Sequence, residues 1–192
     1  LLNNGKIRQM FVSPKSTFSF REIMDGKKIL LVKLDRGRLK GSADLLGSLL
    51  LAKIQMTAFS RTDMAESKRV PFYLYIDEFQ NFATESFTQV LAEARKYKLS
   101  LVLAHQNLAQ LPPSLRASIL TNCGVQAYFR ISRADADMLA KESLAAIYEN
   151  PPGWEWYIQQ LQELQPTFCV VKNKVQGGVA KLQTLDLPLA YE

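Results

Sequence analysis

The chain is poor in the residue types that build most metal and nucleophile sites. It has two cysteines, Cys123 and Cys169, and a single histidine, His105. The cysteines are too few and too far apart for a recognisable zinc site, and each lies in an apolar, strand-like stretch, which predicts reduced thiols in the core. A Ser/His/Asp hydrolase would have to use His105, and no nucleophile-elbow sequence lies near it. The sequence therefore disfavours both classes.

Long apolar runs are also missing. No uninterrupted apolar segment is long enough to cross a bilayer, and no signal peptide is visible at the start. We therefore expect a soluble, cytoplasmic chain, whether or not the protein to which it belongs is attached to a membrane. The first residue is Leu1 and not methionine, and the opening reads like the middle of a longer sequence, so we expect an excised fragment.

Length and charge set broad limits. At 192 residues, 47% of them hydrophobic, the chain is about the size of one soluble domain with a proper core. The 24 Lys and Arg exceed the 18 Asp and Glu, which gives a formal charge of +6. A basic domain is compatible with a nucleic-acid partner, but this excess is spread along the chain and is weak evidence alone.

The most informative segment is VPFYLYIDE, residues 70–78, where a charge-free apolar run ends on Asp77 and Glu78. The run predicts a strand buried on both faces, as in the centre of a parallel α/β sheet, and ligands bind beyond the carboxyl ends of such strands. Nucleotide-hydrolysing motors need one carboxylate to hold Mg²⁺, usually through water, and another to orient or deprotonate the attacking water. We therefore predict Asp77 as the magnesium acid and Glu78 as the base. Alternatively, the pair opens a polar loop or caps the next helix.

Further segments predict alternating strands and helices. Residues 41–60 have helical length and are apolar nearly all round, which predicts a helix buried on more than one side. The charged residues 61–69 predict a solvated loop, and Ser86 with Gln89 fits a capping box. Other predicted strands are KILLVKL at 28–34, LSLVLA at 99–104 and VQAYFRI at 125–131, and other predicted helices span 114–120 and 135–142. This alternation is typical of an α/β fold with a parallel, doubly wound sheet.

The end of the chain has a different pattern. Pro151-Pro152-Gly153 interrupts the chain, a short amphipathic helix follows, and a Gly177-Gly178 turn separates two strand-like runs, which predicts a terminal β-hairpin. The predicted organisation is one domain, with an entry segment at 1–24, a core at 25–142 and the terminal helix and hairpin at 143–192.

The ordered set YLYIDEFQNF, LAEARKYKLSLVLAHQNLAQL and VQAYFRIS resembles the HerA/FtsK group of hexameric DNA motors, and most of all the TraG/TraD-type coupling proteins of conjugation and type IV secretion. The resemblance covers roughly residues 20–142. It implies a RecA-like P-loop ATPase core with ATP and Mg²⁺ as cofactors, in which Asp77 and Glu78 form the Walker B segment. It also implies a homo-hexamer, sequence-independent DNA binding through phosphate contacts, and secretion or relaxosome proteins as further partners.

The resemblance assigns two further residues. Gln106, after the strand at 99–104, matches the glutamine that senses the γ-phosphate, although a strand-end glutamine can also simply bind loop backbone. Arg95 matches the position of an arginine finger offered to the adjacent subunit, although Arg95-Lys96-Tyr97-Lys98 can also be an ordinary solvated helix end. Arg130, at the end of its strand, is a second finger candidate.

One departure from the family is decisive for activity. No segment of the chain reads GxxxxGK[ST], the loop that cradles phosphates. In the resembled family this loop lies upstream, so we expect this chain to be the downstream half of a motor domain and inactive alone. The alternative is a non-catalytic scaffold or partner-docking module. A DExx-type helicase is a third reading, for which the additional motifs are missing.

Overall fold

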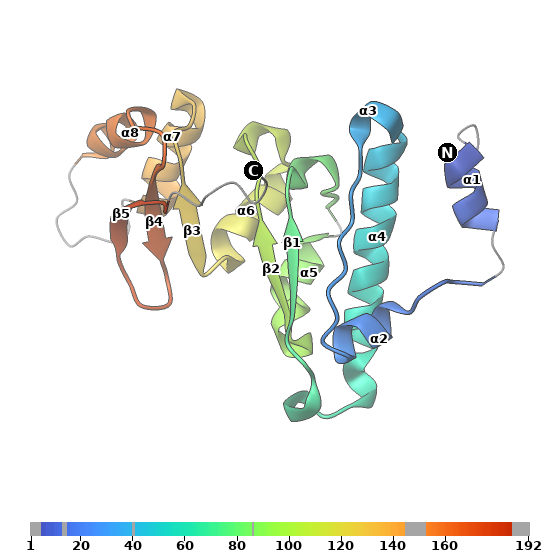
Figure 1. Cartoon of the computed structure of the whole chain (residues 1–192). Coiled ribbons are helices and arrows are strands. Elements are labelled where there is room, and N and C mark those ends of the chain that lie inside the picture. The colour runs from blue at the N-terminus through green and yellow to red at the C-terminus, as the bar shows by residue number, and fades with distance from the viewer. Residues whose placement is uncertain (1–4, 13–14, 40, 86, 145–152, 186–192) are drawn as a thin grey trace. The chain divides into compact units, whose positions relative to one another are not determined.

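The computed structural model describes residues 5–12, 15–39, 41–85, 87–144 and 153–185 (Figure 1). The chain divides into two compact units, Leu1–His105 and Gln106–Glu192. Each unit has its own sheet: a parallel pair of strands in the first and three antiparallel strands in the second.

The sheet of the first unit consists of β1 (Phe72–Ile76) and β2 (Leu99–Leu103), which run parallel. Both strands lie where the sequence predicted them. Burial alternates along β1, because Ile76 is buried whereas Tyr73 and Tyr75 are 59% and 72% exposed. The prediction that this strand is buried on both faces is therefore wrong for the described residues: side chains cover one face, and the tyrosine face is open.

Within its described residues, the first unit also contains helices. They are α1 (Gly5–Val12), α2 (Phe20–Asp25), α3 (Arg36–Leu39), α4 (Ser42–Phe59) and α5 (Phe87–Glu93), with 3-10 turns at Ser60–Asp63 (η1), Glu66–Lys68 (η2), Phe79–Asn81 (η3) and Ala94–Tyr97 (η4). Helix α4 confirms the long helix predicted at 41–60. The predicted capping residue Ser86 lies outside the described residues.

Residues 28–34 differ from the prediction. They connect α2 to α3 without forming a strand, and Ile29 and Leu31 are 87% and 90% exposed. The apolar run suggested a buried strand, but a strand also needs a neighbour to complete its hydrogen-bond ladder. Within the described part of the chain, no strand is paired with this segment.

The second unit contains an antiparallel sheet in the order β3-β4-β5. Its elements are α6 (Pro113–Asn122), β3 (Val125–Tyr128), α7 (Arg133–Leu139), a π-helical turn at Ala140–Leu144, α8 (Trp154–Gln162), β4 (Phe168–Asn173) and β5 (Val179–Gln183). A 3-10 turn, η5, spans Leu108–Gln110. The predicted hairpin is confirmed, with Gly177 and Gly178 at positive φ in its turn. An α/β fold is thus confirmed, whereas the described strands make one parallel and two antiparallel pairings and not a mostly parallel sheet.

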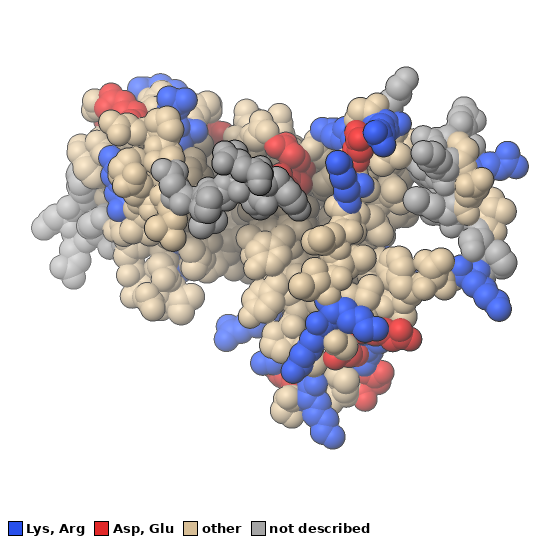
Figure 2. Space-filling model, in the orientation of Figure 1, with Lys and Arg blue, Asp and Glu red and all other residues tan. Residues whose placement is uncertain are grey.

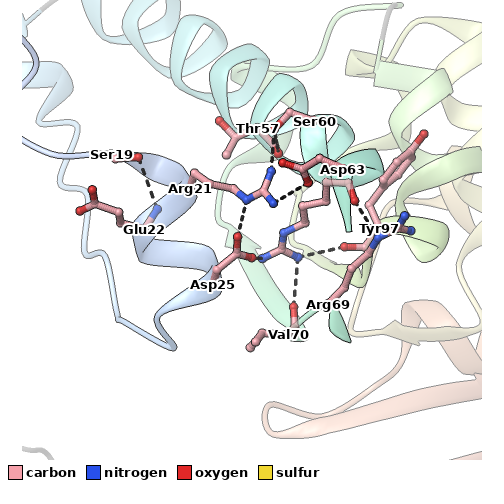
Figure 3. Close-up of polar contacts among 11 residues, drawn as sticks. Ser19, Arg21, Glu22, Asp25, Thr57, Ser60, Asp63, Arg69, Val70 and Tyr97 are labelled. Atoms are coloured by element: carbon pink, nitrogen blue, oxygen red, sulfur yellow. Dashed lines mark hydrogen bonds and ion pairs between the residues drawn. The ribbon is translucent and has the colours of Figure 1, made fainter. Parts of the chain in front are cut away.

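The prediction of a solvated loop at 61–69 is wrong at Arg61, which is buried. Arg61 is fully buried, and its Nη1 donates to the carbonyl oxygens of Val70 at 3.0 Å and Tyr97 at 2.9 Å (Figure 3). Its Nη2 lies 3.0 Å from Asp25 Oδ1. Arg61 therefore joins α2 to the residues that lead into β1 and β2.

Two more arginines extend this contact into a network (Figure 3). Arg21 pairs with Asp25 and with Asp63, the latter at 2.8 Å. Arg69 donates to the carbonyl oxygens of Arg61 at 3.0 Å and of Lys96, and its guanidinium lies over the Tyr97 ring. The amino-terminal edge of the strand pair is thus held by side chains from α2, η1 and the segment before β1.

We expect Arg61→Met to destabilise the first unit strongly. The change leaves the carbonyl oxygens of Val70 and Tyr97 without their donor, at about 1–3 kcal/mol for each buried acceptor left unsatisfied, and it removes one of the two arginine partners of Asp25. Hydrogen exchange of the β1 and β2 amides measures the opening free energy. The matched control is Arg38→Met, whose side chain is 87% exposed in its pair with Asp35. Equal hydrogen-exchange protection of the β1 and β2 amides in both variants would show that Arg61 contributes nothing to the stability of the strand pair.

The first unit also exposes apolar surface. Charged side chains gather at its two ends, near α3 and near η2, and uncharged residues form the surface between them (Figure 2). On α4, Leu45, Leu49 and Met56 are 44%, 42% and 66% exposed. Several exposed apolar side chains along one helix favour association.

We therefore expect the isolated chain to bind an apolar-surface dye and to self-associate as its concentration rises. Replacing Leu31, which is 90% exposed, with Lys should reduce both signals without loss of fold, because the side chain contributes little burial. Light scattering and dye fluorescence measure the two effects. A chain that stays monomeric and does not bind the dye would contradict the expectation.

Candidate functional site

The acid pair lies at the carboxyl edge of the parallel strands. Beyond the ladder, Ala104 N donates to Ile76 O at 2.9 Å, and Phe79 N donates to Ala104 O at 2.9 Å. Asp77 and Glu78 sit between these two bonds, so the backbone on both sides of them is fixed to the end of β2. This is the edge at which ligands of open α/β sheets bind.

Glu78 adopts a left-handed backbone conformation, with φ 51° and ψ 42°. A non-glycine residue in this region costs of order 1–3 kcal/mol and persists where the surroundings hold it. Within the pair, Glu78 N donates to Asp77 Oδ1 at 2.9 Å, and Gln80 Nε2 donates to Glu78 Oε2 at 2.6 Å. The turn therefore fixes both carboxylates locally.

Aromatic packing anchors the same turn. Phe79 is fully buried, and its ring centroid lies 5.0 Å from that of Phe87 at the start of α5. A Cβ on Gly47 would lie 2.3 Å from the Phe82 ring, so α4 can approach this closely only with a glycine there. Ser48 Oγ also donates to Phe82 O at 3.3 Å. The turn that carries Glu78 is thus fixed to two helices.

The exposed Asp77 carboxylate suits a magnesium ion shared with phosphates. The described residues contain no cluster of three or more His, Cys, Asp or Glu that could hold a metal by itself. Mg²⁺ in nucleotide sites is usually held by one or two carboxylates, with water and substrate phosphates completing the shell. Asp77 at the strand edge, with Glu78 beside it, is compatible with that arrangement.

Arg95 lies at the other end of the strand pair. It is exposed on η4, and Lys98, three residues later, accepts the hydrogen bond from Phe72 N at the start of β1. Since β1 spans five residues, the two edges are separated by roughly 16 Å. The fold therefore does not bring Arg95 and the acid pair together within one chain.

Gln106 and Arg130 belong to the second unit, and both are exposed. Gln106 precedes η5, which is capped by Asn107 Oδ1 accepting from Ala109 N at 2.7 Å. Leu108 N in the same turn donates to Asp135 Oδ2 at 3.3 Å. Gln106 thus enters a turn that is fixed to α7, only two residues after Ala104.

The two cysteines are free thiols, as predicted. Cys169 is buried and Cys123 is half-buried, and burial raises the pKa of the Cys123 thiol. A thiol whose pKa is raised is a poor nucleophile. Gln80 is a site residue that the sequence did not predict, and its only signal in the sequence is its position two residues after Glu78.

Residues 71–143 match the protein family described as the TraM recognition site of TraD and TraG. No curated protein sequence matches the chain. No helix in the described ranges is both long and apolar enough to span a membrane.

Three solved structures share the fold. The bacterial conjugative coupling protein TrwBdeltaN70 aligns with a TM-score of 0.65 at 15% identity, over 92% of this chain and 46% of its own. The genome packaging NTPase B204 from Sulfolobus turreted icosahedral virus 2, in complex with AMPPCP, aligns with a TM-score of 0.58 at 11% identity, over 90% and 73%. VirB4 of Thermoanaerobacter pseudethanolicus aligns with a TM-score of 0.53 at 13% identity, over 80% and 40%.

The chain thus spans less than half of the TrwB and VirB4 structures that it matches. The family match, residues 71–143, includes β1, the acid pair and β2. Residues 71–143 are therefore similar to the C-terminal region of TraD and TraG, and the chain has a fold shared with a conjugative coupling protein and a genome packaging NTPase.

Proposed function

We propose that this chain is the downstream part of an ATP-hydrolysing DNA translocase or coupling ATPase for conjugation, type IV secretion or DNA processing. The observation that carries the proposal is the carboxylate pair at the carboxyl edge of two parallel strands, with Glu78 held in a left-handed turn. The TraG/TraD region supports it, as does the fold shared with an NTPase in complex with AMPPCP. The proposed core is RecA-like, with a GxxxxGK[ST] loop supplied from outside this sequence.

Each site residue has a distinct proposed role. Asp77 binds Mg²⁺ through water, and the ion supplies charge neutralisation at the phosphate oxygens. Glu78 accepts a proton from the attacking water, and Gln106 senses the γ-phosphate by hydrogen bonding. DNA is held mainly through its phosphates, by a homo-hexamer, independently of sequence.

We expect Glu78→Gln, in the full-length protein, to lower kcat for DNA-stimulated ATP hydrolysis by about 10²–10⁴-fold, because the amide cannot accept the proton. Nucleotide binding should be retained, since Asp77 and the phosphate loop are unchanged. The measurement is steady-state ATPase activity together with the affinity for a non-hydrolysable ATP analogue.

The control is Glu85→Gln, which removes the same charge from an exposed glutamate further along the turn. This variant should keep the wild-type rate. If Glu78→Gln also hydrolyses ATP at the wild-type rate, Glu78 is not the base and the proposal loses its central residue.

Arg95 is proposed to act on the site of a neighbouring subunit, because it lies at the opposite strand edge from its own acid pair. Arg95→Ala should then abolish most ATPase activity, whereas Lys96→Ala, one position away, should not. Mixing Arg95→Ala subunits with Glu78→Gln subunits should restore part of the activity, since some interfaces then pair an intact Glu78 with an intact Arg95. No recovery on mixing would exclude a role in trans.

The second candidate function is a non-catalytic scaffold or docking module of a secretion complex. The description of the matched family as a TraM recognition site favours it, and so does the lack of GxxxxGK[ST] in the chain. The sequence of the full-length protein separates the two candidates. A GxxxxGK[ST] between a strand and a helix, upstream of Leu1, favours the motor, and its absence favours the scaffold.

A further inference from the structure

Gln80 makes a contact that differs from the other glutamine–glutamate pairs described. Gln89 and Gln159 donate to Glu93 and Glu163 at 3.0 Å, each four residues along a helix. Such pairs are common on exposed helix surfaces and stabilise a helix only slightly. Gln80, by contrast, lies in η3 and donates at 2.6 Å to a glutamate two residues before it, at the carboxyl edge of the sheet.

We infer that Gln80 is a positioning residue for Glu78. This inference rests on the proposed function, in which Glu78 accepts a proton from water. The left-handed backbone sets the direction in which the Glu78 side chain leaves the turn, and the bond to Oε2 fixes where the carboxylate ends. Without the amide donor, the rotatable side chain can move its carboxylate away from the water.

Gln80 is well placed to hold this contact because its own position is fixed. It is half-buried, it directly follows the buried Phe79 in the sequence, and the turn is held further by the Phe82 ring against Gly47. A carboxylate accepts hydrogen bonds and does not donate them, so the amide must direct its nitrogen toward Glu78.

This orientation leaves the amide oxygen of Gln80 in an unfavourable position. It is buried and has no hydrogen-bond partner among the described residues. An unpartnered buried acceptor is unfavourable, whereas a hydrogen bond to a charged group is stronger than one between neutral groups. The contact with Glu78 is therefore the interaction that keeps the side chain in this orientation.

Loss of this hydrogen bond should lower the rate, because it lets the Glu78 carboxylate move from its position. Displacing a catalytic group by about 1 Å can cost of order 10²-fold in rate. We therefore expect Gln80→Ala and the nearly isosteric Gln80→Glu to lower kcat of the full-length ATPase by about 10–100-fold, with KM for ATP unchanged. Gln80→Glu keeps the packing of the turn but removes the donor, so a loss in this variant does not come from a cavity.

The matched control is Gln89→Ala, which removes a glutamine–glutamate hydrogen bond on α5 and should leave kcat unchanged. A wild-type kcat in both Gln80 variants overturns the inference. A raised kcat also overturns it, because Gln80 would then hold Glu78 away from the water. The rate of Glu78→Gln separates this failure from failure of the proposed function: if that variant is active, the function itself is wrong.

A second measurement needs no catalysis and uses this chain directly. The side-chain amide protons of Gln80 should shift in the NMR spectrum and exchange faster with solvent in Glu78→Ala, whereas those of Gln89 should not. Glu93→Ala should give the reverse pattern. An unchanged Gln80 amide signal in Glu78→Ala would show that the bond does not form in solution and would overturn the inference.

Discussion

The first unit depends on the buried guanidinium of Arg61. Burial lowers the pKa of this group, which is the sign of a charge taken out of water, while the nearby Asp25 carboxylate opposes the change. A planar guanidinium presents several donors in a fixed geometry, so one side chain can serve Asp25 and two backbone carbonyls at once. These partners come from α2, from the entry to β1 and from η4. Without that shared donor, three segments distant in sequence would lose their common anchor.

The two edges of the strand pair are held by different interactions. Arginines hold the amino edge, through the carbonyl oxygens of Lys96 and Tyr97 in the turn that also carries Arg95. The carboxyl edge is held by aromatic packing around Phe79 and carries the acids. Under the proposed function, the finger and the base therefore sit on opposite ends of one rigid pair of strands. A subunit could then offer one edge to its own nucleotide and the other to its neighbour's.

The sequence predicted the features that local pattern determines. Apolar runs that end on Asp77 and on His105 marked β1 and β2, and helical spacing marked α4. Features that depend on distant partners were missed. Residues 28–34 have a strand-like pattern but no described partner, and Arg61 reads as a loop residue because Asp25 lies 36 positions earlier. The contact between Gln80 and Glu78 was missed for another reason. It depends on the left-handed backbone of Glu78, and an Asp-Glu sequence does not predict that conformation.

One backbone residue joins the two sides of the acid turn. Ala104 donates to Ile76 O and accepts from Phe79 N, so it joins the strand before the acids to the turn after them. The carboxyl edge therefore holds Asp77 and Glu78 through the end of β2 as well as through the aromatic contact of Phe79. A backbone change at Ala104 would reach both flanks of the acid pair at once, because each flank makes a hydrogen bond to this residue.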